Sequence, residues 1–264
     1  MSKKDGVVPA AGRLIEGTLQ PAAKEAGKES KPLGREVGHV TTRAGKLILA
    51  PLRGAIWCGE QIVSFIETKV EERTKEIPEE KLQAPDPQIT GPSLEALRYC
   101  GSKDELADMF AGLIASSMNK DYNSNVHPSF VEVIKQLTRS EAVMLSKWAK
   151  TRHDIACADV HRIINRQTGN YQLIIENLTL EFRNVFAEHG GYSNVSISNL
   201  LRLGLLYKPE GAFLAKQEAY DQIENDDVFQ SQRQLYGKEN IRLDKGVITL
   251  SPYGNVFLTT CATS

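Results

Sequence analysis

The sequence predicts a mainly α-helical protein with a small α+β unit at its C-terminal end, and three observations support this prediction. Apolar residues recur at helical spacing in several blocks. Helix-capping residues stand before two of these blocks. Residues 236–250 alternate instead around Asp244-Lys245-Gly246, which is typical of two strands joined by a hairpin turn with Gly where a positive φ is needed.

The composition is that of an ordinary globular protein, with 41% hydrophobic and 25% charged residues among 264. The net charge of −1 excludes a global field that would draw the chain to nucleic acid or membrane. Residues 1–60 differ, because they hold ten Lys or Arg against six Asp or Glu. The first 40 residues lack the apolar core of a secretory signal. Scattered cysteines without a Cys-x-x-Cys pair indicate reduced, buried thiols in a cytoplasmic protein: Cys58, Cys100, Cys157 and Cys261.

The N-terminal part divides into two stretches. Residues 1–44 are rich in Gly, Ala, Lys and Glu and are predicted to be flexible. Residues 45–77 are predicted to form an amphipathic helical segment. Within residues 45–66, charges spaced by seven fall on one narrow face and apolar side chains lie near the opposite face: Lys46, Arg53 and Glu60 against Ile48, Leu52, Ala55, Ile62 and Ile66.

This segment is the candidate membrane- or partner-binding site, carried by Ile48, Leu52, Arg53 and Trp57. A Trp near the charged edge suits a membrane interface, and basic flanks suit anionic lipid, so we expect peripheral contact at the inner membrane as one alternative. The favoured alternative is a helix docked on protein, either the chain's own core or a second copy. Hydrophobic spacing alone does not distinguish lipid from protein.

The next two stretches are a linker and a helical block. Residues 78–92 carry four prolines and predict an extended linker. In the block of residues 93–137, Ser102 and Glu105 predict a capping box at the start of a helix. The stripe that follows predicts one buried face: Leu106, Met109, Phe110, Leu113 and Ile114.

A polar turn at residues 119–125 is predicted to lie on the surface. Pro128 then opens the next helix at its first position, where its missing N–H costs nothing. We expect His127 to cap this helix or to pack at its start.

Residues 138–264 are predicted to form the C-terminal unit. Thr138 and Glu141 make a second capping box, which opens a helix that ends near His153. The spacing of apolar residues predicts another helix over residues 171–188. A shorter helix, a strand entry and a last helix follow, at residues 196–203, Leu205-Leu206-Tyr207 and Pro252 onward, with Ser251 as the cap of the last.

His153, Cys157 and His161 are spaced by four, which on a helix would place soft metal ligands on one face. Along a straight helix the outer two would lie about 12 Å apart, too far for all three to hold one ion. We therefore expect no metal site and a surface helix with a buried thiol. Motifs of hydrolases, zinc proteases, nucleotide-binding loops and zinc deaminases are absent from the sequence. We expect no enzyme activity and no cofactor.

The block "FAGLIASSMNKD", followed by "VHPSFVEVIKQL" and "TRSEA", resembles the Abi-alpha family of bacterial proteins linked to abortive phage infection. The resemblance implies a role in anti-phage defence. With no catalytic motif in the sequence, we expect this role to depend on protein or membrane contacts, or on self-association.

"NLLRLGLL", followed by the predicted hairpin and "ITLSPYGNVF", resembles the helix and wing of a winged-helix domain. This leaves a DNA-binding transcriptional regulator as the alternative function. The candidate recognition helix offers Arg202 as its one cation, and residues 210–264 hold five Lys or Arg against eight Asp or Glu. Without cations the phosphate-binding term is weak, so packing or protein contact is favoured over nucleic acid.

Overall fold

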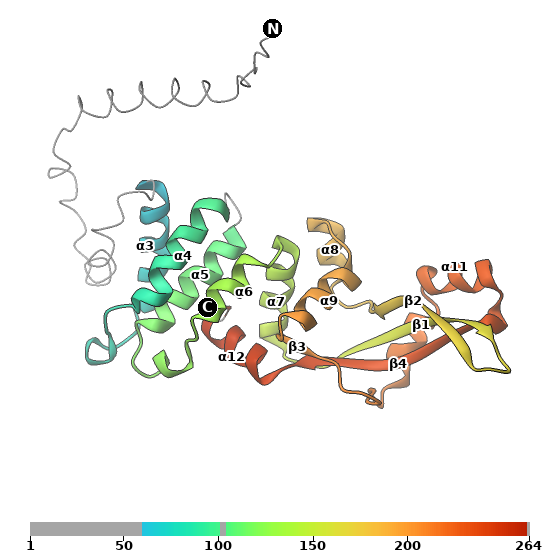
Figure 1. Ribbon diagram of the computed structural model, residues 1–264. Helices are drawn as coiled ribbons and strands as arrows, with labels where there is room; N and C mark the ends of the chain where they lie inside the picture. The colour runs from blue at the N-terminus through green and yellow to red at the C-terminus, as the bar shows by residue number, and fades with distance from the viewer. Residues whose placement is uncertain (1–59, 101–103, 263–264) are drawn as a thin grey trace, which may run out of the picture. The chain divides into compact units, whose positions relative to one another are not determined.

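The computed structural model describes residues 60–100 and 104–262, which belong to one compact unit, Thr42–Ser264. Helices dominate this part of the chain, and a small four-stranded antiparallel sheet lies toward its C-terminal end (Figure 1). The predicted mainly α fold with a C-terminal α+β part is confirmed at this level. The predicted flexible residues 1–44, and residues 45–59 of the amphipathic segment, lie outside the described residues.

The first described helix is α3 (Glu60–Thr74), which contains the last residues of the amphipathic segment. Ile66 and Val70 on this helix are 1% and 0% exposed and belong to the main apolar core. The C-terminal end of the predicted segment is therefore part of the fold.

The predicted extended linker is wrong for its second half, because α4 (Pro87–Cys100) begins inside it and contains Pro92. A proline at the first helical position costs no hydrogen bond, and Asp86 accepts the N–H of Gln88 through Oδ1 at 2.8 Å. The first half, with the 3₁₀ turn η3 (Glu79–Lys81), is held in place by the N–H of Gln83, which donates to the Met118 carbonyl at 2.9 Å. The domain boundaries themselves stay a prediction.

Helix α5 (Asp104–Ser117) is the centre of the helical part and contacts α3, α4, α6, α7 and α12. Its predicted stripe is confirmed, since none of the five side chains is more than 4% exposed. Ser102 of the predicted capping box lies outside the described residues. Glu105, its predicted partner, accepts hydrogen bonds from the guanidinium of Arg139 at 2.9–3.0 Å.

The predicted surface turn is confirmed, with residues 120–125 exposed around the 3₁₀ turn η4 (Asn123–Asn125). Helix α6 (Ser129–Lys135) follows, and Pro128 stands at its N-cap with helical angles. The Nδ1 atom of His127 accepts the N–H of Ser129 at 3.1 Å, so the predicted cap is also confirmed.

Helix α7 (Arg139–Thr151) starts at the predicted capping box of Thr138 and Glu141, in which both hydrogen bonds form. It ends at Arg152, whose φ of 47° turns the chain toward the first strand.

The sheet has the strand order β2-β1-β4-β3, and all its pairs are antiparallel. Its strands are β1 (Ile155–Asn165), β2 (Asn170–Leu178), β3 (Leu206–Tyr207) and β4 (Ile241–Leu250). The predicted helix through Cys157 and His161 is therefore wrong, and so is the first part of the helix predicted over residues 171–188, whereas the last part of the latter is confirmed by α8 (Arg183–His189). Cys157 and His161 lie on β1, where spacing by four does not have its helical meaning, and residues 171–178 lie on β2. On both strands the backbone N–H and C=O groups form hydrogen bonds with residues far away in the sequence. The spacing of apolar residues within one short window does not indicate such pairing.

The predicted hairpin turn at residues 244–246 is also wrong, because β4 runs through it without a break. Gly246 is needed for space rather than for a positive φ. A Cβ atom at this position would lie 3.1 Å from Sγ of Cys157 and 3.1 Å from Cε of Lys208.

The remaining helices are α8 (Arg183–His189), α9 (Ser193–Arg202), α10 (Gln217–Glu224), α11 (Asp227–Tyr236) and α12 (Pro252–Cys261), with the 3₁₀ turn η5 (Lys238–Asn240) before β4. The short helix, its strand and the Ser251-capped last helix are confirmed. The predicted winged-helix unit is not confirmed in the form expected. The residues of its predicted wing form one continuous strand, β4, and α10 and α11 lie between β3 and β4 in the sequence.

Candidate interaction site on the sheet

The residues of the predicted membrane- or partner-binding site, Ile48, Leu52, Arg53 and Trp57, all lie outside the described residues. Arg202 is described, and it lies exposed on the last turn of α9. Its Nη2 atom donates to Oε1 of Gln136 at 2.9 Å and to Oδ1 of Asn199 at 2.7 Å.

The same face of α9 makes further contacts with the start of α7. The amide of Asn199 donates to the Gln136 carbonyl at 3.3 Å and to Oε1 of Glu141 at 3.1 Å. Asn199 and Arg202 of the candidate recognition helix are therefore hydrogen-bonded to another part of the chain, whereas a base-reading helix would leave such side chains free.

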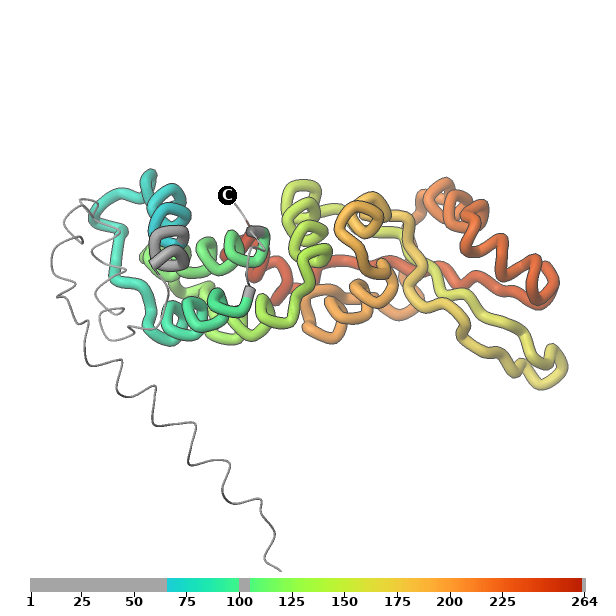
Figure 2. The backbone as a smooth tube through the Cα atoms, turned by 90° about the horizontal axis from the view of Figure 1, so that it is seen from above, coloured from blue at the N-terminus to red at the C-terminus, as the bar shows by residue number. Residues whose placement is uncertain are grey.

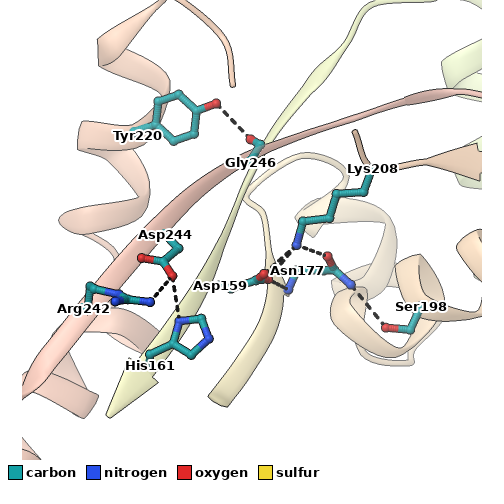
Figure 3. A network of polar contacts seen from close by, with 9 residues as sticks. All are labelled: Asp159, His161, Asn177, Ser198, Lys208, Tyr220, Arg242, Asp244 and Gly246. Atoms are coloured by element: carbon teal, nitrogen blue, oxygen red, sulfur yellow. Dashed lines mark hydrogen bonds and ion pairs between the residues drawn. The ribbon is translucent and has the colours of Figure 1, made fainter. Parts of the chain in front are cut away.

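A polar cluster that sequence reasoning missed lies on one face of the sheet (Figure 3). Nζ of Lys208 contacts both carboxylate oxygens of Asp159 at 2.8 Å and Oδ1 of Asn177 at 2.9 Å. Asn177 is fully buried with a φ of 55°, at a point where the register between β1 and β2 shifts. Asp159 accepts the N–H of Asn177 at 2.9 Å, which the bulge would otherwise leave unpaired. This cluster stabilises a β-bulge.

A second cluster lies on the same face, farther along β1. Nδ1 of His161 lies 3.2 Å from Oδ2 of Asp244 without hydrogen-bond alignment, and Nη2 of Arg242 donates to the same oxygen at 2.6 Å (Figure 3). The Arg242 guanidinium stacks 4.5 Å above the ring of Tyr171, which meets the His161 ring edge-on at 5.0 Å. The cluster holds a cation and an exposed ring in a fixed arrangement.

The opposite face of the sheet is apolar and packs against α10 and α11. Its core includes Val160, Tyr220, Ile223 and Phe229, each at most 3% exposed. The hydroxyl of Tyr220 donates to the Gly246 carbonyl at 2.9 Å (Figure 3). The outer half of the sheet thus has one covered face and one face that carries the polar clusters.

The thiols of Cys157 and Cys261 are buried, as predicted. Burial raises the pKa of the Cys157 thiol to about 12, and the Lys208 ammonium opposes this shift without cancelling it. A thiol in this state is a poor nucleophile and a poor metal ligand. Among residues 60–262, excluding 101–103, no group of three His, Cys, Asp or Glu side chains could hold a metal ion.

None of the described helices is both long enough and apolar enough to span a bilayer.

Residues 58–261 match the family described as Abortive infection alpha. This chain belongs to that family. The match covers the described helices and the sheet, and it confirms the resemblance first carried by the sequence around α5 and α6. No curated protein matches the chain. Among solved structures, it is similar to an uncharacterized protein from the hydrocarbon-degrading marine bacterium Alcanivorax borkumensis SK2, with 13% identity and a TM-score of 0.37 over 55% of this chain and 96% of that chain.

Proposed function

We propose that this protein acts in bacterial defence against phages by abortive infection, and that it does so through contacts with protein or membrane rather than by catalysis. The observation that carries the proposal is the family match over residues 58–261. The non-catalytic part draws support from the described polar clusters, whose charged groups are paired with each other and whose thiol has a raised pKa.

The effector region that we propose is residues 45–59, which include Ile48, Leu52, Arg53 and Trp57. The amphipathic pattern supports this choice. Ile66, the last apolar residue of this pattern, is 1% exposed and belongs to the core. The residues that contact a partner must therefore lie before Ile66. The experiment should therefore remove residues 1–59 and leave α3 intact.

We also infer a winged-helix plan with two insertions. The order α7, β1, α8, α9, β3, β4 and the sheet order β1-β4-β3 support it, with the β1–β2 extension and the pair α10–α11 as insertions. In this plan α9 has the recognition position. Its contacts through Asn199 and Arg202 favour a packing role, and a gel shift near 0.15 M salt should show no Arg202-dependent, sub-micromolar DNA binding.

A phage plating assay tests the defence role. Bacteria that carry the native gene are challenged with phages that grow on the parent strain, beside cells that carry the empty vector. We expect fewer plaques for at least one phage and loss of protection when the chain starts at Glu60. Normal plating of every phage on cells that make the folded full-length protein would contradict the defence role.

A lipid assay separates the two kinds of contact. The change Ile48→Asp with Leu52→Asp removes two apolar side chains, each worth roughly 1.5–3 kcal/mol when buried. Its matched control, Thr41→Asp with Thr42→Asp, adds the same charge just before the segment. If the segment meets lipid, the first variant loses binding to anionic vesicles and the control keeps it. A wild-type chain that ignores anionic vesicles at low salt leaves a protein partner as the effector contact.

A further inference from the structure

The outer end of the sheet is a β-hairpin that continues beyond β4. The pairing of β1 with β4 ends at Arg162 and Ile241, whereas β1 and β2 remain paired as far as Asn165 and Asn170. The turn of this hairpin is held by hydrogen bonds, because Oδ1 of Asn165 accepts the N–H groups of Gln167 at 2.8 Å and of Thr168 at 3.2 Å.

The connection from α11 to β4 lies beside this hairpin (Figure 2). The guanidinium of Arg162 stacks 4.5 Å above the ring of Tyr236. Arg166 donates from Nη2 to the carbonyl of Glu239. These two contacts join residues 160–175 and 228–243 around the outer end of the sheet, and we call these residues the basic end. Arg162 and Tyr236 lie on the side of α11, whereas Arg242 and Tyr171 lie on the opposite face of the sheet.

The basic end concentrates positive charge in a chain whose net charge is −1. Its two ranges hold one acidic residue, Glu239, and five cations: Arg162, Arg166, Arg233, Lys238 and Arg242. Asp227 and Asp244 directly flank the second range, and Asp244 is paired with Arg242 at 2.6 Å, so the cations without a carboxylate partner among these residues are the other four. The basic end also holds eight Asn or Gln side chains. The acidity of the C-terminal sequence belongs to residues 210–227, with six Asp or Glu against one Lys, so the average over residues 210–264 conceals this surface.

The cations of the basic end are partly preorganised. Arg162 and Arg242 are stacked on Tyr236 and Tyr171, which reduces the side-chain freedom that each would lose on meeting a phosphate. Arg233 and Lys238 line a surface hollow of about 510 Å³ together with Gln230, Ser231, Gln234 and one carboxylate, Asp227. The Tyr171 side chain remains 51% exposed.

We propose that the basic end binds single-stranded nucleic acid, with the cations on phosphates and with Tyr171 and the amides on unpaired bases. Duplex DNA fits less well, because the hairpin is tied to the α11–β4 connection and is not a free two-stranded ribbon for the major groove. Anionic lipid needs apolar side chains to insert, and the tip itself, residues 165–170, carries none, although Ile164 and Leu173 beside it are 50% and 46% exposed. Measurements with vesicles therefore stand beside those with oligonucleotides in the test. The sequence favoured packing over nucleic-acid binding because of Arg202 on α9 and the average charge of residues 210–264. Neither observation reveals that cations gather at the basic end.

Fluorescence anisotropy with labelled 20-nucleotide single strands of RNA and DNA tests the proposal on the full chain. We expect micromolar binding at about 0.1 M salt that weakens as salt rises. The triple variant Arg166→Gln, Arg233→Gln, Lys238→Gln should bind about tenfold more weakly, with a salt slope smaller by about 2, from about 0.7 per lost phosphate contact. The matched control Arg98→Gln, Lys147→Gln, Lys150→Gln removes the same charge from α4 and α7 and should bind as the wild type.

The proposal is overturned if the wild type does not bind single strands up to about 50 μM, or if both triple variants bind them equally weakly. It is also overturned if a duplex of the same sequence binds more tightly. The same holds if the basic-end triple variant loses binding to anionic vesicles but not to oligonucleotides. Melting temperatures of both triple variants check that they fold. If the basic-end triple does not fold, the single change Lys238→Gln, at an exposed side chain, tests the same salt slope with an expected decrease of about 0.7.

Discussion

Large side chains are buried in the helical part around α5 and are about half exposed at the basic end of the sheet. Phe110, Leu113 and Ile114 on α5 are 0% exposed. On the hairpin, Tyr171, Leu173 and Ile164 are 46–51% exposed, beside cations stacked on rings. Burial of apolar surface is the main source of stability, and exposed rings with ordered cations are a means of contact. The helices therefore carry most of the buried apolar surface, and the exposed rings and cations of the sheet are where we propose that nucleic acid binds.

The largest effect should come from the centre of the helical part. Phe110→Ala should lower the free energy of unfolding by about 3–5 kcal/mol, since it removes a fully buried ring. Urea unfolding measures this change. Tyr122→Ala, at a side chain 48% exposed in the polar turn, is the control and should change it by less than about 0.5 kcal/mol. If both variants lowered the free energy of unfolding equally, the assignment of Phe110 to the core and of Tyr122 to the surface would be contradicted.

The junction between the sheet and the last helix should be the next most sensitive place. A Cβ atom at Gly254 on α12 would lie 1.9 Å from the carbonyl oxygen of Leu205, so Gly254→Ala should cost at least about 1–3 kcal/mol. Gly91 on α4 has nothing within 4 Å of such an atom apart from its chain neighbours, but Pro92 follows it and disfavours helical angles for a residue with a Cβ. Gly91→Ala should therefore change stability much less than Gly254→Ala does. Thermal melting of the two variants measures the difference. A Gly254→Ala protein as stable as the wild type would show that this junction is loosely packed.

Alkaline pH should weaken the inner end of the sheet. The pKa of Cys157 is raised from 9.0 to about 12 in the folded chain, so its contribution is complete below pH 9 and is lost as the pH rises toward 12. Between pH 8 and pH 10 the free energy of unfolding should fall by roughly 1.4 kcal/mol more in the wild type than in Cys157→Ala. Urea titrations at the two pH values measure the difference. The same loss in both proteins would mean that this thiol ionises freely when folded.

The smallest of these effects should come from a helix end. Thr138→Ala removes the side chain that caps α7 and should cost about 1 kcal/mol. Thr138→Ser keeps the hydroxyl and should recover most of the loss. If Ser does no better than Ala, the hydrogen bond to the N–H of Glu141 is not what stabilises this end.

Local signals were sufficient for most of the helical part, although the start of α4 was missed because its prolines predicted a linker. The stripe on α5, the capping box of α7 and the Ser251 cap of α12 each depend on residues within two or three turns, and all three are present. The sheet could not be predicted in the same way. Val160, for example, pairs with Ile175 on one side and with Leu243 on the other, and such partners leave no periodic trace in either sequence window.

The basic end was missed for the same reason. Arg162 and Arg166 come from a stretch whose net charge is modest, and Lys238 and Arg242 follow a strongly acidic stretch. Only the antiparallel pairing of β1 with β4 places them together. The role of Gly246 was also predicted wrongly. The sequence indicated a glycine in a turn, whereas in the structure the absence of a side chain at this position leaves room for Cys157.

Hydrogen–deuterium exchange of the full chain, with and without a single-stranded 20-mer, tests the division between the two regions most directly. The account predicts that residues 106–114 of α5 exchange slowest in both samples and that residues 163–172 exchange much faster in the free protein. Added oligonucleotide should slow exchange at residues 162–172 and 233–242 and leave α5 unchanged. Slow exchange of the free hairpin, with no change at the basic end on addition of the oligonucleotide, would contradict the account.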